Sequence, residues 1–480
     1  MYDVIIIGGG PGGYLAAERL GHQKKRVLLI EERYLGGTCL NVGCIPTKTL
    51  LNSAKLYAHA REGEKFGVTA GDLSFDWGTI QRWKAEVVEK LRAGVAAQMK
   101  RFGVEVLSGR GEILLPPSGG RPGKVAVSPP ALPPAPGEHE GKAGAGEYEA
   151  AAILVSTGSI PALPPIPGSR DNPRVRDSTG LLSVETPPGR LAVIGGGVIG
   201  VEFAGLFSAF GSEVTVIEMM DEIVPFMDRE QAPLLRRAMR GVDFKLGRKV
   251  ERIEGGRVHY TGKDGKAETT EADLILMAVG RRPVLEGWGA KTAGIDTGAG
   301  GVKVDDRMRT NVPGVWAAGD VTGRSLLAHS AYRMAEVAVA DILESAGGPE
   351  VPGLNRMRYN AIPWAVYGLT EAAGVGITEQ EAAARGIPIR KASLPMRVSG
   401  RFAAENTFAG QGAVKVIAGE DAGPGSGRIL GIHAVGAYAP EFIWGGAALI
   451  EQEFRVADLR QLIFPHPTVC ELIRDAAWEL

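Results

Sequence analysis

The sequence YDVIIIGGGPGGYLAAERL at residues 2–20 decides the fold. Its uninterrupted apolar run over residues 2–7 predicts a strand of the buried, parallel type. A helix is predicted from Tyr14 to about Leu20. The turn between the two elements carries glycines with the spacing G-x-G-x-x-G, at Gly8, Gly10 and Gly13.

An acidic residue completes this pattern. A second strand is predicted over residues 26–30, and it ends at Glu31, eighteen residues after the last glycine. The first glycine makes the tight turn, the second lets a pyrophosphate approach the backbone, and the third packs the helix on the strand. The helix N-terminus then faces the phosphates, and the carboxylate accepts a hydrogen bond from a ribose hydroxyl. The pattern therefore predicts a dinucleotide site.

The same unit returns about 187 residues later. A strand is predicted over residues 190–194, a helix over 201–210 and a strand over 213–217, followed by Glu218. The glycines of this second loop are Gly195, Gly197 and Gly200. The repetition indicates an internal duplication of one fold. Two dinucleotide sites in one chain imply two cofactors that exchange electrons.

Glu218 favours NAD over NADP in the second site. Its carboxylate would accept from a free 2′-hydroxyl and repel a 2′-phosphate, and Met219 and Met220 offer no arginine. The sequence alone leaves open that Glu218 is a solvated strand end.

Composition sets the broader limits. The 480 residues are 44% hydrophobic and 23% charged, with a net charge of −1, so we expect two to four packed domains. A generally basic nucleic-acid-binding protein is not indicated, although a local basic patch stays open. The chain has no run of 18 apolar residues and no secretory signal pattern, so we expect a soluble, cytoplasmic protein.

Two regions lie outside the duplicated units. Residues 116–147 contain 8 prolines and 7 glycines, and we interpret them as a surface insertion or flexible loop, with a binding role for residues 129–134 as the alternative. The last 130 or so residues predict a separate α+β domain. Its expected strands span 412–417 and 429–435, and its expected helices span 378–385 and 440–452.

The chain has three cysteines, Cys39, Cys44 and Cys470. Three cysteines are too few for a secreted disulfide framework, and no His/Cys cluster completes a metal site. A redox role is therefore favoured for Cys39 and Cys44. In an ideal helix their Cα atoms would be about 8–9 Å apart, too far for a disulfide. A bridge therefore requires a distorted turn, which the neighbouring glycines allow; two unpaired thiols are the alternative. Lys48 lies one helical turn beyond Cys44.

These residues also carry a family resemblance. The sequence LGGTCLNVGCIPTK at residues 35–48 resembles the active-site signature of the pyridine nucleotide-disulfide oxidoreductases, and within them the dihydrolipoamide dehydrogenases. The resemblance covers nearly the whole chain, apart from the insertion. It implies a redox-active Cys39–Cys44 disulfide, FAD in the first site and NAD in the second. It also implies that Glu202 pairs with Lys48 beside the flavin.

The resemblance implies the remaining cofactor contacts and the domains. The implied contacts are Gly111, Asp320 and Ala328 for FAD, and Val250 and Gly280 for NAD. The implied fold is α/β, with two Rossmann-like dinucleotide-binding domains and a C-terminal α+β dimerisation domain. The expected boundaries are 1–160 and 283–349 for the FAD-binding domain, 161–282 for the NAD-binding domain and 350–480 for the dimerisation domain.

The last motif is HPTVCE at residues 466–471. Pro467 is expected to begin a helix that continues to Trp478. A histidine at a helix start is usually a cap or a surface residue, but the resemblance implies that His466 is a base and Glu471 its orienting carboxylate. In the family this pair reaches the disulfide of the other subunit, so a homodimer is implied.

The implied activity is the oxidation of dihydrolipoyl groups to lipoyl groups, with hydride transfer through FAD to NAD⁺. The implied partner is a lipoyl-bearing protein of a 2-oxoacid dehydrogenase or glycine cleavage complex. Three departures from the family pattern, at Val284, at residues 367–371 and at Phe464, put the physiological partner in doubt. The alternatives are a related reductase with another thiol or disulfide substrate, and a non-catalytic flavoprotein that serves as a docking subunit or redox sensor.

Overall fold

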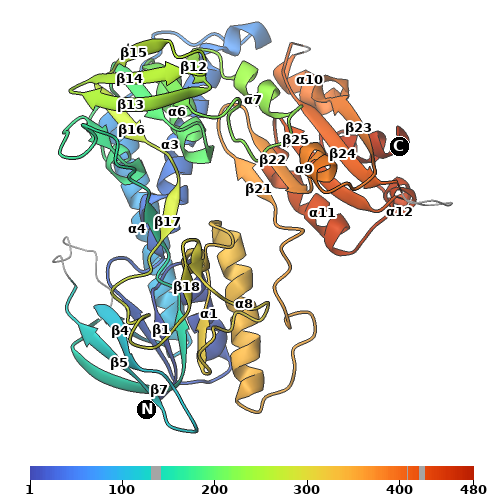
Figure 1. The fold of residues 1–480 in the computed structure, drawn as a ribbon. Coiled ribbons are helices and arrows are strands. Elements are labelled where there is room, and N and C mark those ends of the chain that lie inside the picture. The colour runs from blue at the N-terminus through green and yellow to red at the C-terminus, as the bar shows by residue number, and fades with distance from the viewer. Residues whose placement is uncertain (131–141, 408, 421–426) are drawn as a thin grey trace. The chain divides into compact units, whose positions relative to one another are not determined.

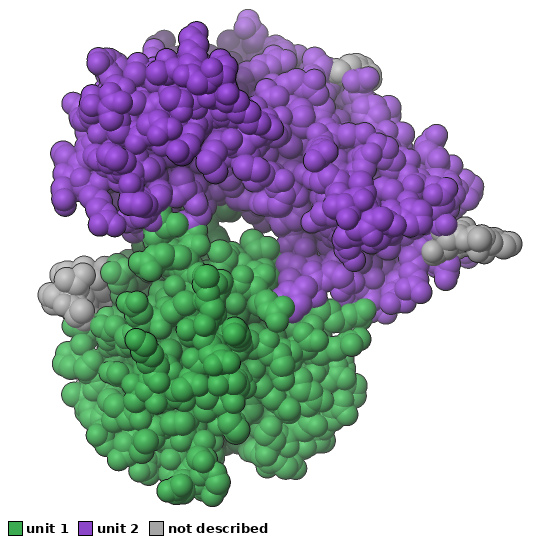
Figure 2. Space-filling model, in the orientation of Figure 1, with its two compact units in different colours: residues 1–49, 79–162, 281–358 green, residues 50–78, 163–280, 359–480 purple. Residues whose placement is uncertain are grey.

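The computed structural model describes residues 1–130, 142–407, 409–420 and 427–480. The chain forms two compact units, coloured green and purple in Figure 2. The first unit contains residues 1–49, 79–162 and 281–358, and the second contains residues 50–78, 163–280 and 359–480. The finer boundaries expected from the sequence stay a prediction.

An eight-stranded sheet forms the core of the first unit (Figure 1). Strand β1 (Tyr2–Ile7) pairs in parallel with β2 (Val27–Glu31) and with β7 (Gly146–Val155), so its apolar residues are covered on both sides. The order is β4-β5-β7-β1-β2-β3-β6, and β20 also pairs with β7. The other strands are β3 (Glu105–Ser108), β4 (Arg110–Leu115), β5 (Gly123–Ser128), β6 (Lys142–Ala143) and β20 (Val315–Ala317).

Helix α1 (Pro11–His22) follows β1 and packs against α8 (Ala328–Ser345). It starts three residues earlier than predicted, because proline is tolerated in the first turn of a helix. Helices α3 and α4 each have residues in both units. The other elements in this part of the chain are α2 (Gly37–Val42), α3 (Cys44–Arg61), α4 (Trp77–Arg101), β8 (Ser159–Pro161), β17 (Arg281–Pro283), β18 (Thr297–Gly298), β19 (Gly301–Val302) and η2 (Asp320–Thr322).

The prediction of a loop over residues 116–147 is wrong for β5. This strand pairs antiparallel with both β4 and β7, and its alternate residues Val125 and Val127 are buried. Buried and more exposed side chains alternate along this strand, as they do in a sheet. The segment is a strand despite the surrounding prolines because a neighbouring strand pairs with each of its edges. Most of the suggested binding stretch, residues 131–134, lies outside the described residues.

Asp341 on α8 anchors the segment that leads into β20. Its buried carboxylate accepts hydrogen bonds from Arg307 (3.0 Å), from Arg309 (2.5 and 2.6 Å) and from Trp316 Nε1 (2.9 Å). Burial raises the pKa of this carboxyl, but the hydrogen bonds from Arg309, Trp316 and Arg307 outweigh it and leave the pKa below its ordinary value.

A five-stranded parallel sheet of order β12-β11-β10-β16-β9 carries the repeated motif in the second unit. Strand β10 (Arg190–Ile194), helix α6 (Val198–Ala209) and strand β11 (Glu213–Glu218) confirm the predicted elements, with α6 starting three residues earlier. The other elements here are η1 (Gly63–Phe66), β9 (Val175–Arg176), α5 (Ser178–Leu181), α7 (Ala232–Ala238), β12 (Val242–Leu246), β13 (Arg248–Glu254), β14 (Arg257–Gly262), β15 (Ala267–Glu271) and β16 (Leu274–Met277).

Residues 359–480, called the C-terminal module below, contain an antiparallel sheet of order β21-β22-β25-β24-β23, with α11 packed on β22 and β25. The strands and helices predicted here are confirmed within two residues. The elements are β21 (Trp364–Val366), β22 (Ala372–Gly376), α9 (Glu379–Ala384), β23 (Ile389–Pro395), η3 (Met396–Val398), α10 (Gly400–Asn406), β24 (Ala413–Gly419), β25 (Ile429–Val435), α11 (Ala439–Glu451), α12 (Val456–Gln461) and α13 (Leu472–Trp478).

The predicted start of the last helix at Pro467 is wrong. Helix α13 begins at Leu472, because residues 466–471 form a turn closed by side-chain hydrogen bonds. In this turn Thr468 Oγ1 donates to the carbonyl of Pro465 (2.7 Å), and Glu471 accepts from the Thr468 N–H (3.3 Å). Among the described residues, no helix is long and apolar enough to span a membrane.

Candidate active site

The glycines of the first loop have three different surroundings. Gly8 has φ +103°, and a Cβ there would lie 2.2 Å from the carbonyl oxygen of Ser156. A Cβ on Gly13 would lie 1.8 Å from the carbonyl oxygen of Gly8, where α1 passes close to β1. A Cβ on Gly10 would come no closer than 3.8 Å to any described atom outside its neighbours. Only the second glycine therefore faces open space, as the approach of a pyrophosphate requires.

Glu31 holds this loop in place. Its Oε2 accepts from the Gly9 N–H (2.6 Å), and its Oε1 accepts from the N–H groups of Arg33 (2.7 Å) and Tyr34 (3.2 Å). Burial raises the pKa of this carboxyl, although the three hydrogen bonds favour its ionised form.

The second loop repeats this geometry. Gly195 also has φ +103°, and a Cβ on Gly200 would lie 2.0 Å from the Gly195 carbonyl oxygen. A Cβ on Gly197 would have no described atom within 4 Å. Glu218 is only 8% exposed, and its two oxygens accept from the N–H groups of Gly196 (2.6 Å) and Met220 (2.7 Å). Glu218 is therefore not a solvated strand end, and the loop fits a dinucleotide.

Asp320, a predicted flavin contact, belongs to a network that the sequence did not reveal. Ser159 Oγ donates to Asp320 (2.5 Å), and Arg281 donates both to Ser159 Oγ (2.8 Å) and to its carbonyl (2.6 Å). Burial raises the pKa of Asp320 above its ordinary value, against the opposing effects of Ser159 and Arg281. Ala328, the next predicted flavin contact, is the first residue of α8.

The other predicted cofactor residues have varied positions. Gly111 on β4 faces Ile7 and Ile30, at the carboxyl ends of β1 and β2. Gly280 has φ +108° and open space at its Cβ position. Val250 on β13 is half-buried and packs on the core cluster of this sheet. Their cofactor contacts stay predictions.

Cys39 and Cys44 lie on either side of a helix break. Helix α2 ends at Val42, Gly43 takes φ −143° and ψ −111°, and α3 begins at Cys44. The distorted turn expected from the sequence is thus present. The two cysteines are thiols here, and their side chains form a hydrogen bond that defines a dithiol pair. The redox-active disulfide stays a prediction.

The electrostatics of the two thiols differ. The hydrogen bond with Cys44 and burial raise the pKa of Cys39, while the ammonium of Lys48 and the Cys44 N–H act in the opposite direction. Cys44 is the first residue of an 18-residue helix, whose N-terminus stabilises negative charge on its sulfur. The arrangement therefore favours a proton on Cys39, and the start of α3 would stabilise negative charge that develops on Cys44.

A pair of tyrosines near the cysteines escaped the sequence analysis. Tyr14 on α1 and Tyr332 on α8 have hydroxyl oxygens 2.5 Å apart. Burial raises the pKa of both hydroxyls, and negative charge on the nearby cysteine pair would act in the same direction. No motif marks Tyr332, whereas the position of Tyr14 directly after Gly13 gave a weak signal that it lies in the first turn of the helix.

Glu202 is buried on α6 and accepts a hydrogen bond from the Tyr367 N–H (3.0 Å). Its predicted pairing with Lys48 stays a prediction.

His466 and Glu471 are brought together as predicted. His466 Nδ1 and Glu471 Oε2 are 3.1 Å apart. The Glu471 side chain is buried, and that of His466 is 77% exposed. A buried carboxylate thus orients the ring, while the ring itself faces outward, as a base for an external partner requires.

Family models match most of the chain. The pyridine nucleotide-disulphide oxidoreductase model matches residues 2–335, and the dimerisation domain of the same family matches residues 362–477. The chain belongs to this family of oxidoreductases, whose cofactors are FAD and NAD(H). The predicted fold class is confirmed.

Individual relatives and solved structures are similar to this chain over nearly its whole length. The chain is 36% identical to dihydrolipoamide dehydrogenase of Chaetomium thermophilum (99% of this chain, 90% of the relative). It is 37% identical to dihydrolipoyl dehydrogenase of Thermus scotoductus (99% and 96%). Among solved structures it resembles the HOCl-induced flavoprotein disulfide reductase RclA of Escherichia coli, with a TM-score of 0.81 and 29% identity (99% of each chain). It also resembles LpdA of Mycobacterium tuberculosis, with a TM-score of 0.85 and 26% identity (100% and 99%).

Proposed function

We propose that this enzyme oxidises dihydrolipoyl groups and delivers the electrons through FAD to NAD⁺. The observation that carries the proposal is the pair of thiols at the helix break, with Cys44 at the N-terminus of α3. Relatives named dihydrolipoyl dehydrogenase, aligned over 99% of this chain, support the choice of substrate.

The reaction begins on the oxidised, disulfide-bonded form of the pair. A substrate thiolate attacks the sulfur of Cys39, which breaks the Cys39–Cys44 bond and leaves Cys44 as a thiolate. The second substrate sulfur then displaces Cys39 and closes the lipoyl disulfide. The protein has gained two electrons as a dithiol, and the substrate has lost them. Lys48 and the start of α3 stabilise the charge on Cys44.

His466 serves as the base that takes the substrate proton, and Glu471 fixes its orientation. The exposed ring of His466 fits a role at the dithiol pair of a second subunit. Exposed apolar side chains of the C-terminal module support a homodimer in which they would be buried. They include Trp444, Ile463 and Trp478, with exposed fractions of 70%, 98% and 62%.

The residues of the first loop would hold FAD and those of the second NAD⁺. When bound, these groups would accept the two electrons and transfer them as hydride. Gly8, Gly13 and Glu31 shape the first loop, and Gly195, Gly200 and Glu218 shape the second. We place the enzyme in the cytoplasm, where a lipoyl-bearing protein of a 2-oxoacid dehydrogenase or glycine cleavage complex would supply the substrate.

The test is NADH formation by the purified protein with dihydrolipoamide and NAD⁺. We expect rapid turnover that Cys44→Ser abolishes, while Cys470→Ser, which alters the third thiol, leaves it unchanged. A folded yellow dimer without turnover would overturn the choice of substrate. The second candidate is then reduction of another disulfide. The similarity to RclA and the departure at Phe464 favour it.

A further inference from the structure

Residues 219–231, called the anchor segment below, follow Glu218 and contain a strained valine. Val224 has φ +44°, in the left-handed region that β-branched residues avoid, and it precedes Pro225. Its side chain is fully buried. Such a conformation is strained and persists only where the surroundings hold it.

The backbone of Val224 contacts the second dinucleotide loop. Its N–H donates to the carbonyl oxygen of Gly196 (2.8 Å). The N–H of Gly196 donates to Glu218 (2.6 Å). Both backbone polar groups of Gly196 are therefore held by the chain itself, and the left-handed turn at Val224 supplies one of these two bonds.

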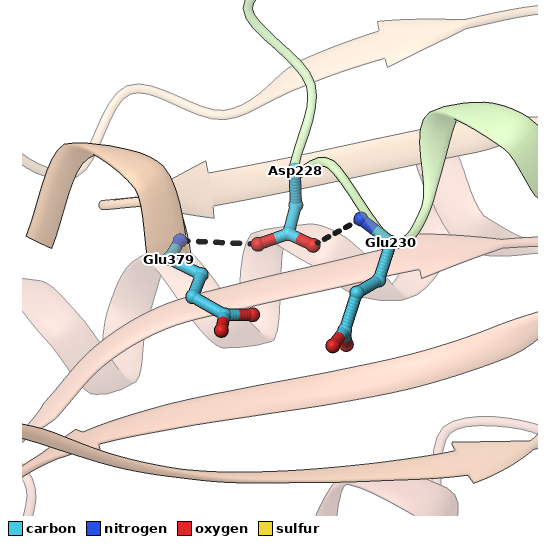
Figure 3. A group of neighbouring side chains, drawn as sticks. All are labelled: Asp228, Glu230 and Glu379. Atoms are coloured by element: carbon cyan, nitrogen blue, oxygen red, sulfur yellow. Dashed lines mark hydrogen bonds between the residues drawn. The ribbon is translucent and has the colours of Figure 1, made fainter. Parts of the chain in front are cut away.

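A buried ion pair holds the other end of the anchor segment. Asp228 and Lys415 are both 0% exposed, and the ammonium lies 2.9 and 3.1 Å from the two carboxylate oxygens. The carboxylate of Asp228 also accepts from the N–H groups of Glu230 and Glu379, at 3.1 Å each (Figure 3). Lys415 comes from β24, so the pair ties the anchor segment to the sheet of the C-terminal module.

The carboxylates of this cluster already surround a cation of the chain. Besides Asp228, Lys415 Nζ contacts Glu230 (2.9 Å) and Glu379 (2.6 Å). Lys391 Nζ contacts the same two glutamates, at 2.7 and 2.6 Å, but its side chain is 39% exposed. Removing one partner of a buried pair leaves an uncompensated charge, whereas removing an exposed partner changes little. Among the ion pairs of this cluster, the Asp228–Lys415 contact is therefore the one whose loss should disturb the anchor segment most.

We infer that Asp228 and Lys415 are positioning residues for NAD⁺, because they hold Val224 in the turn that fixes the carbonyl of Gly196. Both side chains are fully buried, so the pair cannot reach a cofactor directly. It acts through the loop, so its loss should weaken NAD(H) binding without slowing the reaction of the cysteines with substrate. This inference rests on the proposed binding of NAD(H) at the second loop.

The test compares Asp228→Asn, which keeps the shape of the side chain, with Lys391→Met, which removes an ammonium of the same cluster that does not contact Asp228. The readouts are the dissociation constant of NADH, KM and kcat with NAD⁺, and the stopped-flow rate of flavin reduction by dihydrolipoamide. For Asp228→Asn we expect the NADH dissociation constant and the KM for NAD⁺ to rise about tenfold, with the flavin reduction rate within twofold of wild type. For Lys391→Met we expect every value within twofold.

A second variant serves as the control for the case in which Asp228→Asn does not fold. Asp228→Asn/Lys415→Met removes both buried charges, leaves no unpaired ion and should fold; it should show the same rise in KM. The inference fails if Asp228→Asn binds NADH like wild type, if Lys391→Met weakens binding equally, or if flavin reduction falls in parallel. Absence of NADH binding by the wild-type protein would instead overturn the proposed function.

Discussion

Substitution of the second and third glycines of the second dinucleotide loop by alanine should have separate effects on NADH binding and on stability. Gly197→Ala adds a methyl group where the structure places no described atom within 4 Å. Gly200→Ala adds the same methyl group 2.0 Å from the carbonyl oxygen of Gly195. The two changes are chemically identical and three residues apart, so each is the control for the other.

The magnitudes follow from these distances. Cβ atoms essentially never come within 3.0 Å of another atom, so Gly200→Ala must move α6 away from β10 by about 1 Å. Overpacking typically costs 1–3 kcal/mol, and here the opposing atom is backbone, so we expect a loss of about 3 kcal/mol in the free energy of unfolding. Gly197 has φ −72° and ψ −177° as the N-cap of α6, a conformation that alanine accepts, so we expect a loss of about 1 kcal/mol or less.

For NADH binding we expect the larger loss in Gly197→Ala. The methyl group of Gly197→Ala occupies the space through which a pyrophosphate reaches the loop, so we expect the NADH dissociation constant to rise at least thirtyfold, about 2 kcal/mol. Urea unfolding and NADH titration of both variants measure the two quantities, and flavin absorbance reports the first loop. The reasoning is refuted if Gly197→Ala binds NADH within threefold of wild type, or if Gly200→Ala unfolds at the wild-type urea concentration.

Three further changes test other contacts. Cys44→Ala removes the hydrogen bond that raises the pKa of Cys39, so alkylation of Cys39 by iodoacetamide should begin at lower pH than in wild type; an unchanged pH profile would contradict this assignment. His466→Gln should lower dihydrolipoamide turnover by about 10²–10⁴-fold, with NADH-driven ferricyanide reduction, which needs no base, as the unaffected control. Asp341→Asn should destabilise the protein by about 2 kcal/mol at pH 7. Because the folded pKa of Asp341 is lowered, this stabilisation is present above about pH 4 and is lost as the pH falls through the folded value, so wild type and variant should converge in acid urea titrations.

Short-range signals made the two dinucleotide units predictable. The strand, glycines, helix and acid of each unit lie within about 30 residues, and the residue types follow from steric demands that apply wherever the motif occurs. The break between Cys39 and Cys44 was predictable for the same reason, since an ideal helix cannot bring residues five apart into contact.

Strand β5 and the turn before α13 were predicted wrongly because other contacts outweighed the local signal. The prolines around residues 123–128 are typical of a loop, but β4 and β7 on either side hold the strand. Pro467 is typical of a helix start, but the hydrogen bonds of Thr468 and Glu471 favour a turn.

The roles of Val224, Asp228 and Lys415 had no local signal in the sequence. A left-handed valine before a proline contradicts the preferences of both residues, so only the packing around it explains it. Lys415 stands in the apolar run of a correctly predicted strand, and its partner Asp228 is 187 residues away in the sequence. Contacts of this range become visible only in the folded chain.

The hydrogen bonds of Glu218 have a consequence for engineering the enzyme toward NADP. The usual design replaces such an acid with a neutral or cationic residue, which removes repulsion of the 2′-phosphate. Here the same carboxylate is the acceptor for the backbone N–H groups of Gly196 and Met220, so that design would also release the loop that it aims to adapt. A successful change of cofactor preference would therefore require a second substitution that provides a new acceptor for the Gly196 N–H.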